Sequence, residues 1–345
     1  MPNRAPRERL TRRGVLGGLG SLGLSLGGCG GAPPPVAPPA PEPTEVPELE
    51  ALLPSAGLTW LLRLRPRAIA SLPWLIPLLG RFVPEARFDA YREHTGLDLR
   101  QIPEVYLAGY AREGGEETLA VLRHNVDPAL LERRFALRLA SKSTRSVDRP
   151  DLVRVAGRVG RRVEVFSRVG RDVAIYQRGG ELDRGMLRVA ALRAQGKLGG
   201  HRAALELEPM GELSRRFGDA PFVWLMPGPF DGELRGAALG LLEASTGVGL
   251  ALRSTARGHL GLAAAVLADW GDRGADAGEL LGDVYTSLER TSFGRVLGLH
   301  QPIERPVVAG DRGVASLSVE LDPARFVEGL AALVEQDVER VLGLD

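Results

Sequence analysis

Three short segments in the middle of the chain alternate apolar and polar residues, and they constrain the fold more than any other feature. They read DLVRVAGRV (151–159), RVEVFSRV (162–169) and DVAIYQR (172–178), and each is separated from the next by two residues that include a glycine. A two-residue turn joins antiparallel strands, because a parallel crossover needs a dozen residues or more. Since side chains alternate between the faces of a strand, each strand has an apolar face and a more polar one. We therefore expect an antiparallel sheet here.

The rest of the body alternates strand patterns with helix patterns. Strands are expected at 58–66, 220–226 and 313–321, and hairpins at 105–123 and 248–267. Helices are expected at 67–96, where three prolines break the pattern and Gly96 ends it, at 232–247, at 276–297, and after the Asp-Pro pairs at 127–128 and 322–323. These patterns predict an α+β fold in which antiparallel sheets carry helices packed on one face.

Two features suggest an internal duplication. The hairpins at 105–123 and 248–267 correspond to one another, and two further segments both run strand, Asp-Pro-Ala and amphipathic helix. We therefore expect two related units of a hairpin plus a helix, an N-terminal α+β unit over 51–200 and a C-terminal one over 201–345.

The first 28 residues have the layout of an export signal. A polar, basic head precedes an uncharged apolar run from Gly14 to Gly28, which is shorter than the roughly 20 residues that a membrane-spanning helix needs. Within the head, Thr11-Arg12-Arg13-Gly14-Val15-Leu16 resembles the twin-arginine export motif, with Arg12 and Arg13 as its arginine pair. The resemblance implies a signal peptide over residues 1–28 that is cleaved during export.

The only cysteine of the chain follows this run directly. Leu26-Gly27-Gly28-Cys29 resembles the lipobox of bacterial lipoproteins, which implies a diacylglyceryl group on Cys29 and cleavage before it. One acyl chain holds a protein to a bilayer only weakly, whereas two or three make release slow. The implied partner is therefore membrane lipid, through acylated Cys29. Gly30 is not the aspartate that signals inner-membrane retention in some bacteria, which favours the outer membrane.

Residues 29–50 should form a tether. The stretch 32–50 contains eight of the 25 prolines, and proline can neither continue a helix nor pair inside a sheet. An extended proline-rich chain acts as a semi-rigid spacer. We expect it to hold the folded body away from the membrane, facing the periplasm or the cell surface.

Most kinds of chemistry find no support in the body. The five histidines lie far apart, and a single cysteine excludes a CxxC metal or redox site, so we expect neither a metal nor a cofactor. No GxSxG elbow, SxxK pair or phosphate-binding loop occurs outside the leader. From Cys29 onward the chain has 39 Arg and Lys against 42 Asp and Glu, a balance that does not favour nucleic-acid binding.

Two segments of the body could still act as interaction sites. The run 154–171 is rich in arginine and could bind anions or glycans, although the solvated face of a sheet gives the same pattern. The candidate anion-binding residues are Arg154, Arg158, Arg161, Arg162 and Arg168. The segment 68–83 is the most apolar part of the body, and we interpret it as core rather than as a loop that dips into lipid.

Together these features predict a lipid-anchored protein of the bacterial cell envelope whose α+β body works by binding or structural interaction. An envelope protein, a glycan or an apolar molecule could be the partner. The alternative is an envelope hydrolase whose site is assembled only in three dimensions. A cleft lined by carboxylates or by a Ser/His pair would favour the hydrolase, and a mainly apolar groove would favour binding.

Overall fold

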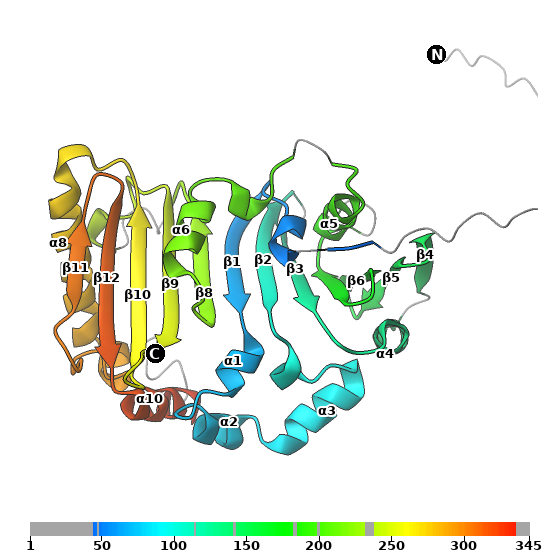
Figure 1. The fold of residues 1–345 in the computed structure, drawn as a ribbon, viewed down its shortest axis with the longest axis horizontal. Helices are drawn as coiled ribbons and strands as arrows, with labels where there is room; N and C mark the ends of the chain where they lie inside the picture. Colours follow the sequence, from blue (N-terminus) through cyan, green and yellow to red (C-terminus); the bar gives the residue numbers. More distant parts are fainter. Residues whose placement is uncertain are drawn as a thin grey trace, which may run out of the picture. The chain divides into compact units, whose positions relative to one another are not determined.

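The computed structural model describes residues 44–46, 48–113, 115–140, 143–181, 185–198, 201–231 and 238–335. These residues form one continuous sheet of twelve strands in the order β11-β12-β10-β9-β8-β1-β2-β3-β7-β6-β5-β4, as Figure 1 shows. The first seven strands along the chain are β1 (Leu58–Leu64), β2 (Val105–Arg112), β3 (Gly115–Arg123), β4 (Thr144–Arg149), β5 (Leu152–Val159), β6 (Arg162–Val169) and β7 (Val173–Arg178). The other five are β8 (Phe222–Pro227), β9 (Gly247–Ser254), β10 (Leu260–Leu267), β11 (Val307–Gly310) and β12 (Val314–Leu321).

Every pair of neighbouring strands is antiparallel, which confirms the α+β class expected from the alternating segments. Strand β1 lies at the centre and pairs with β2 on one side and with β8 on the other. Outward from this seam, β1, β2 and β3 mirror β8, β9 and β10. The two hairpins compared in the sequence therefore occupy matching places.

The two Asp-Pro helices do not occupy matching places. Helix α4 (Pro128–Arg138) follows β3, the third strand from the seam, whereas α10 (Pro323–Glu335) follows β12, the fourth. An Asp-Pro pair is a local helix-start signal. It therefore does not determine which strand of the sheet precedes the helix. The similarity between the Asp-Pro segments before α4 and α10 does not mean that the two helices occupy equivalent positions.

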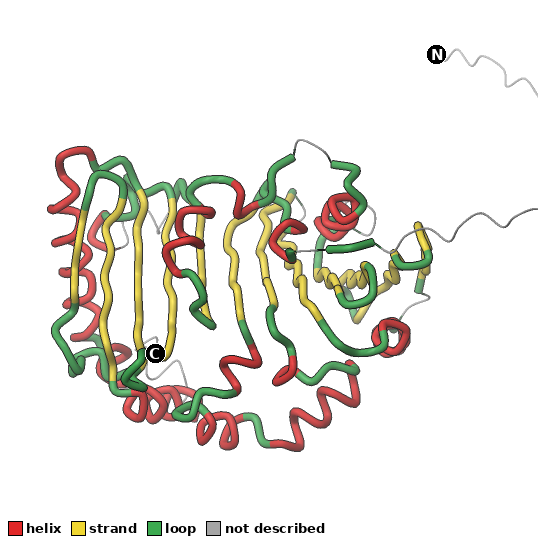
Figure 2. Tube along the Cα trace, in the orientation of Figure 1, coloured by secondary structure: helices red, strands yellow, loops and turns green. Residues whose placement is uncertain are grey.

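Three short helices follow β1 where the prolines interrupt the apolar segment. They are α1 (Pro66–Ala70), α2 (Ile76–Phe82) and α3 (Glu85–Thr95), and they curl along one end of the strands in Figure 2. Gly96 ends α3 with a φ of 85°, a left-handed conformation that glycine adopts without strain. The helical expectation for 67–96 is confirmed as this broken series.

The remaining helices lie elsewhere along the sheet. They are α5 (Met186–Ala194), α6 (Met210–Phe217), α8 (Gly274–Arg290) and α9 (Ser292–Val296). The 3₁₀ turns are η1 (Leu49–Leu52), η2 (Leu99–Gln101), η3 (Ala204–Glu206), η4 (Ala238–Gly240) and η5 (Gly271–Arg273). The helix expected at 232–247 does not form over its described part, because Ala238, Leu239 and Gly240 all have positive φ angles.

Helices cover both faces of the sheet rather than the single face expected. On β3, Leu119 and Val121 belong to the same buried core as Met186 of α5. The alternate side chain of Leu122 packs on the opposite face, with the core that contains Leu131 and Phe135 of α4. We call these the α5 face and the α4 face. Because both faces are covered, the central strands carry apolar side chains on both sides.

The chain joins the body earlier than the tether prediction placed it. Val46 and Leu49 are only 8% and 3% exposed and belong to the core of the α5 face. A guanidinium N–H of Arg123 also donates to the carbonyl oxygen of Val46, at 2.8 Å. Residues 44–50 were expected in the spacer, but their apolar side chains and backbone contacts place the described ones, 44–46 and 48–50, in the body.

Candidate functional site: an apolar pocket on the α4 face

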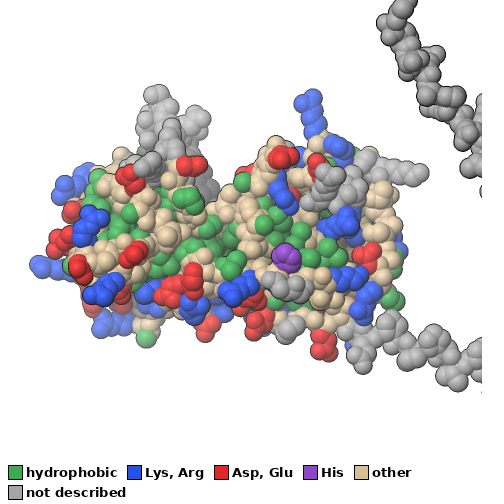
Figure 3. All heavy atoms as spheres, turned by 90° about the horizontal axis from the view of Figure 1, so that it is seen from above, with side chains coloured by type: hydrophobic (Ala, Val, Ile, Leu, Met, Phe, Trp, Pro, Cys, Tyr) green, Lys and Arg blue, Asp and Glu red, His purple; other side chains and the backbone are tan. Residues whose placement is uncertain are grey.

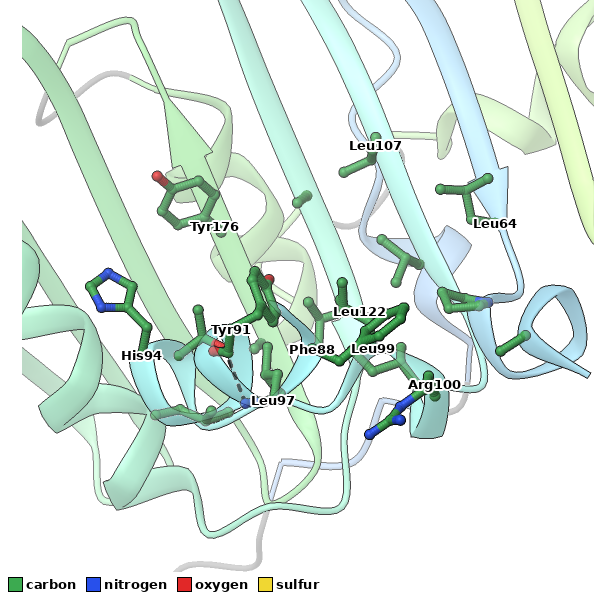
Figure 4. Close-up of a pocket in the computed structure, with 18 of the residues that line it drawn as sticks. Leu64, Phe88, Tyr91, His94, Leu97, Leu99, Arg100, Leu107, Leu122 and Tyr176 are labelled. Atoms are coloured by element: carbon green, nitrogen blue, oxygen red, sulfur yellow. Dashed lines mark hydrogen bonds between the residues drawn. The ribbon is translucent and has the colours of Figure 1, made fainter. Parts of the chain in front are cut away.

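A pocket of about 640 Å³ lies on the α4 face, at the end of the sheet where α1, α3 and α4 gather. The side chains on its sheet side come from β1, β2, β3, β6 and β7; they are Leu64, Val105, Leu107, Ala120, Leu122, Phe166, Ala174 and Tyr176. Its other wall comes mainly from the helices and includes Ile69, Ala70, Leu79, Phe88, Tyr91, Leu131 and Phe135. Figure 4 shows members of both sets around a common space, with Leu107, Leu122 and Tyr176 on the strands and Phe88 and Tyr91 on α3.

Strand register explains why the floor of the pocket is apolar. Leu107 pairs with Ala120, and Ala120 pairs with Tyr176, so these three side chains lie side by side on the α4 face. Paired side chains on adjacent strands point to the same side of a sheet. The small side chain of Ala120 between two large ones leaves open space at this point.

Helix α4 is set in place by its first residues. The carboxylate of Asp127 accepts a hydrogen bond from the Ala129 N–H at 3.0 Å, and Pro128 occupies the first helical turn. This cap fixes where the helix begins. Leu131, Phe135 and Arg138 then follow at spacings of four and three residues, which places them on one side of the helix, facing the pocket.

Aromatic rings build one end of the pocket. The rings of Phe135 and Phe166 stack with centroids 5.4 Å apart and an angle of 28°, and the ring of Tyr176 meets Phe135 edge-on at 5.8 Å and 78°. Such geometries stabilise aromatic pairs beyond the area that they bury. Burial raises the pKa of the Tyr176 hydroxyl, and Glu164 beside it raises this pKa further. Tyr176 is therefore a neutral phenol at physiological pH.

Two arginines border the pocket in different surroundings. The guanidinium of Arg100 contacts the carboxylates of Asp98 at 2.8 Å and Glu85 at 2.5 Å, and it lies over the ring of Phe88. Its hydrogen bond lowers the pKa of Asp98, so that carboxylate stays ionised. Among the described residues, Arg138 contacts the carboxylate of Glu164, at 3.4 Å.

The described lining of the pocket is mainly apolar. It contains no aspartate, glutamate, serine, cysteine or lysine, and its titratable groups are two tyrosines, one histidine and two arginines. Across the described part of the chain, no three His, Cys, Asp or Glu side chains gather as a metal site would require. The described lining is therefore that of a mainly apolar groove and not that of a cleft lined by carboxylates or by a Ser/His pair.

The arginines of the run 154–171 do not gather on one face. Arg154 and Arg158 lie on the α5 face of β5, the same face as the core residues Leu152 and Ala156. By the same alternation on β6, Arg162 and Arg168 share the α4 face with Phe166, and Arg161 lies in the turn. A guanidinium of Arg168 also donates to the Pro150 carbonyl at 2.6 Å. The anion-binding patch stays a prediction, with its members divided between two faces and a turn.

The export and lipidation motifs lie outside the described residues. This applies to Arg12, Arg13, Leu26, Gly27, Gly28 and Cys29. Within the residues that are described, no helix combines the length and the apolar character needed to cross a bilayer.

Sequence reasoning did not identify the pocket. It interpreted 68–83 as core, and Ile69, Ala70 and Leu79 from this segment line the pocket instead. One signal was present in the hairpin 105–123, where both alternating sets of side chains are apolar. That pattern requires a cover on each face, but it does not show whether the cover is packed tightly or leaves a cavity.

Comparisons with known proteins identify a structural likeness and no family. No family model matches the sequence, and no curated protein matches it. Among solved structures, crystal forms III, IV and I of TP0453 from Treponema pallidum are similar, with 12%, 13% and 12% sequence identity and TM-scores of 0.46, 0.48 and 0.46. The matches cover 84–85% of this chain and 98–99% of the other. This similarity concerns the fold alone.

Proposed function

We propose that the body binds an apolar molecule in the pocket on the α4 face. The observation that carries the proposal is a cavity of about 640 Å³ whose described lining is almost entirely aliphatic and aromatic. Pockets for small molecules measure about 300–1,000 Å³ and combine an apolar lining with a few polar groups. The pocket has both properties, because Tyr91, His94, Arg100, Arg138 and Tyr176 are the main polar groups along it.

We propose further that this body is anchored in the bacterial cell envelope through lipid on Cys29. The support is the order of motifs in the sequence: the arginine pair, the uncharged run, the lipobox and then the proline-rich stretch. Two or three acyl chains give stable attachment to a bilayer. The outer membrane is the proposed site, with the body facing the periplasm or the cell surface.

Anchor and pocket together give a concrete role. A protein tied to a membrane by a spacer can take up an apolar molecule close to the surface and shield it from water inside the body. Shielding is favourable by about 25 cal/mol for each Å² of apolar surface removed from water. An envelope protein or a glycan as an additional partner stays a prediction from the sequence.

The proposal is tested by filling the pocket. In Ala120→Phe, the new ring should occupy the space between Leu107 and Tyr176. We expect the affinity for N-phenyl-1-naphthylamine, a neutral apolar fluorophore, to fall at least tenfold, which corresponds to about 1.4 kcal/mol. The full chain is used with Cys29→Ser, so that no detergent is needed.

Ala111→Phe is the matched control, because Ala111 is exposed at the end of β2 and outside the pocket. This control should bind the fluorophore like the parent chain. Equal binding by all three proteins, or no binding by the parent chain, would refute the pocket as the site. Thermal unfolding of each variant shows that it is folded.

A further inference from the structure

We infer that the ligand of this pocket is a single-chain amphiphile with an anionic headgroup, and that Arg138 contacts the headgroup. The inference rests on the proposed function, since it names the class of molecule that the pocket takes. Three observations carry it: the asymmetry between the two arginines, the position of Arg138 at the aromatic end, and the size of the cavity.

The two arginines that line the pocket differ in how their charge is balanced. The carboxylates of Glu85 and Asp98 contact the guanidinium of Arg100 at 2.5 and 2.8 Å, so the positive charge of Arg100 is already balanced. Arg138 has one carboxylate within 4 Å among the described residues, and the distance to this carboxylate, that of Glu164, is 3.4 Å. A guanidinium carries five N–H donors in a planar fork, which suits a second carboxylate or a phosphate.

The burial of the Arg138–Glu164 pair indicates which partner faces a ligand. The side chain of Glu164 is only 6% exposed, whereas that of Arg138 is 29% exposed and lines the pocket. The carboxylate therefore lies beneath the guanidinium and holds it in place. We assign Glu164 as a positioning residue and Arg138 as the group that meets the headgroup.

Aromatic groups surround Arg138 on the pocket side. Its guanidinium carbon lies 5.8 Å from the ring centre of Tyr176 and 5.9 Å from that of Phe135. Such contacts between a cation and aromatic rings stabilise the charge of the guanidinium. Figure 4 places His94 and Tyr176 at one end of the pocket and Arg100 at the other. The aromatic end therefore offers a cation and hydrogen-bonding groups. At the other end Arg100 is already paired with two carboxylates, and Leu64 and Leu107 offer apolar contacts.

The volume of the pocket suits one chain. The cavity of about 640 Å³ lies within the range of about 300–1,000 Å³ that pockets for small molecules measure. One long acyl chain with a small headgroup is a molecule of this class. A long-chain carboxylate thus matches the pocket in volume, in apolar surface and in the sign of its charge.

The test compares headgroups on one chain length. Dodecanoate, dodecanol and dodecyltrimethylammonium, each below its aggregation concentration, compete with N-phenyl-1-naphthylamine for the full chain carrying Cys29→Ser. We expect dodecanoate to displace the fluorophore at a concentration about tenfold lower than dodecanol, and the ammonium compound to be the weakest, because a charge-assisted hydrogen bond adds to the affinity of the carboxylate.

Variants assign the preference to one arginine. Arg138→Met should reduce the preference for dodecanoate over dodecanol to less than about twofold, and Arg138→Lys should keep part of it. Arg100→Met is the matched control at the opposite end and should keep the full preference. A preference that survives Arg138→Met, or that is lost in Arg100→Met instead, would overturn the assignment.

The outcomes separate this inference from the proposed function. Binding of the fluorophore and of all three amphiphiles with equal affinity overturns the headgroup assignment and leaves the apolar pocket in place. A parent chain that binds neither the fluorophore nor any amphiphile overturns both.

Discussion

At the scale of single residues, a buried carboxylate of β3 lies against the start of α5. Glu117 on β3 is 1% exposed, and its carboxylate accepts a hydrogen bond from the N–H of Met186. Gln177 on β7 accepts from the next N–H, that of Leu187, at 3.0 Å. Two side chains of the sheet thus cap a helix whose own N-cap, Gly185, has no side chain to do so.

Burial raises the pKa of Glu117 above the ordinary 4.5, although the Met186 N–H and Arg112 oppose the shift. A raised pKa means that folding favours the protonated form, so this group contributes stability at acid pH that is lost as the pH rises through the raised pKa. Glu117→Gln keeps an oxygen acceptor for Met186 and cannot ionise. We therefore expect its free energy of unfolding, relative to the parent, to increase as the pH rises from below 4.5, by about 1.4 kcal/mol for each unit of pKa shift.

Urea unfolding between pH 4 and pH 8 measures this difference. Glu113→Gln, a change of the same type near the exposed turn of this hairpin, serves as the control and should follow the parent at every pH. Parallel curves for the parent and Glu117→Gln would show that the burial of this carboxylate has no energetic consequence.

Residue-scale features were predictable from the sequence where they are local. Asp127 and Asp322 cap the helices that follow them, and Gly96 ends a helix with the positive φ angle that its position requires. The pairing of Glu117 with Met186 was not predictable, because the two residues lie 69 positions apart and meet only through the register of β3 and β7. Arg138 was not singled out for the same reason.

At the scale of elements, α4 connects the fold to the pocket. It contributes Leu131, Phe135 and Arg138, and its start depends on the cap by Asp127. Asp127→Ala should lower the free energy of unfolding by about 1 kcal/mol. Because fraying moves side chains that line the pocket, we also expect weaker binding of the apolar fluorophore.

The chain provides a matched control for this prediction. Asp322 caps α10 in the same way, through the Ala324 N–H at 2.9 Å, and α10 contributes no residue to the described lining of the pocket. Asp322→Ala should lower stability by a similar amount and leave binding unchanged. Equal losses of binding in both variants would mean that stability alone, and not the position of α4, controls the pocket.

Elements were predictable where one physical signal dominates. The strands β5, β6 and β7 follow from alternation and short turns, and α1, α2 and α3 follow from proline positions. Strand β4 was not expected, because its sequence TRSVDR is polar and five of its six residues are exposed. Residues 232–247 were expected to form a helix, but Ala238, Leu239 and Gly240 all have positive φ angles, which a right-handed helix does not contain.

At the scale of the whole molecule, one face of the described body carries a band of apolar side chains. In Figure 3, hydrophobic side chains gather along the middle of the view and charged side chains along its flanks.

The strand order and the presence of helices on both faces arise from pairings between distant segments, which local patterns do not encode. The class of the fold was therefore predictable from the sequence, whereas the joining of the strands into one continuous sheet was not.

Attachment to the envelope is a prediction at this same scale. Cys29→Ser removes the sulfur that the lipobox presents for acylation, so the exported protein should move from the membrane fraction to the soluble fraction of cells. Mass spectrometry of the parent should find lipid on an N-terminal Cys29. A serine variant that stays with the membrane as before would refute the anchor and leave the pocket to be tested separately.

The central seam has a consequence for synthesis. Strand β1 is completed by β8 through four residue pairs, from Leu61 with Leu225 to Leu64 with Phe222. While a ribosome is still making the residues between these strands, β1 exposes an edge that can pair with the same strand of another nascent chain. We expect chains truncated before Phe222 to aggregate, and the emerging first half to need a chaperone until the second half arrives.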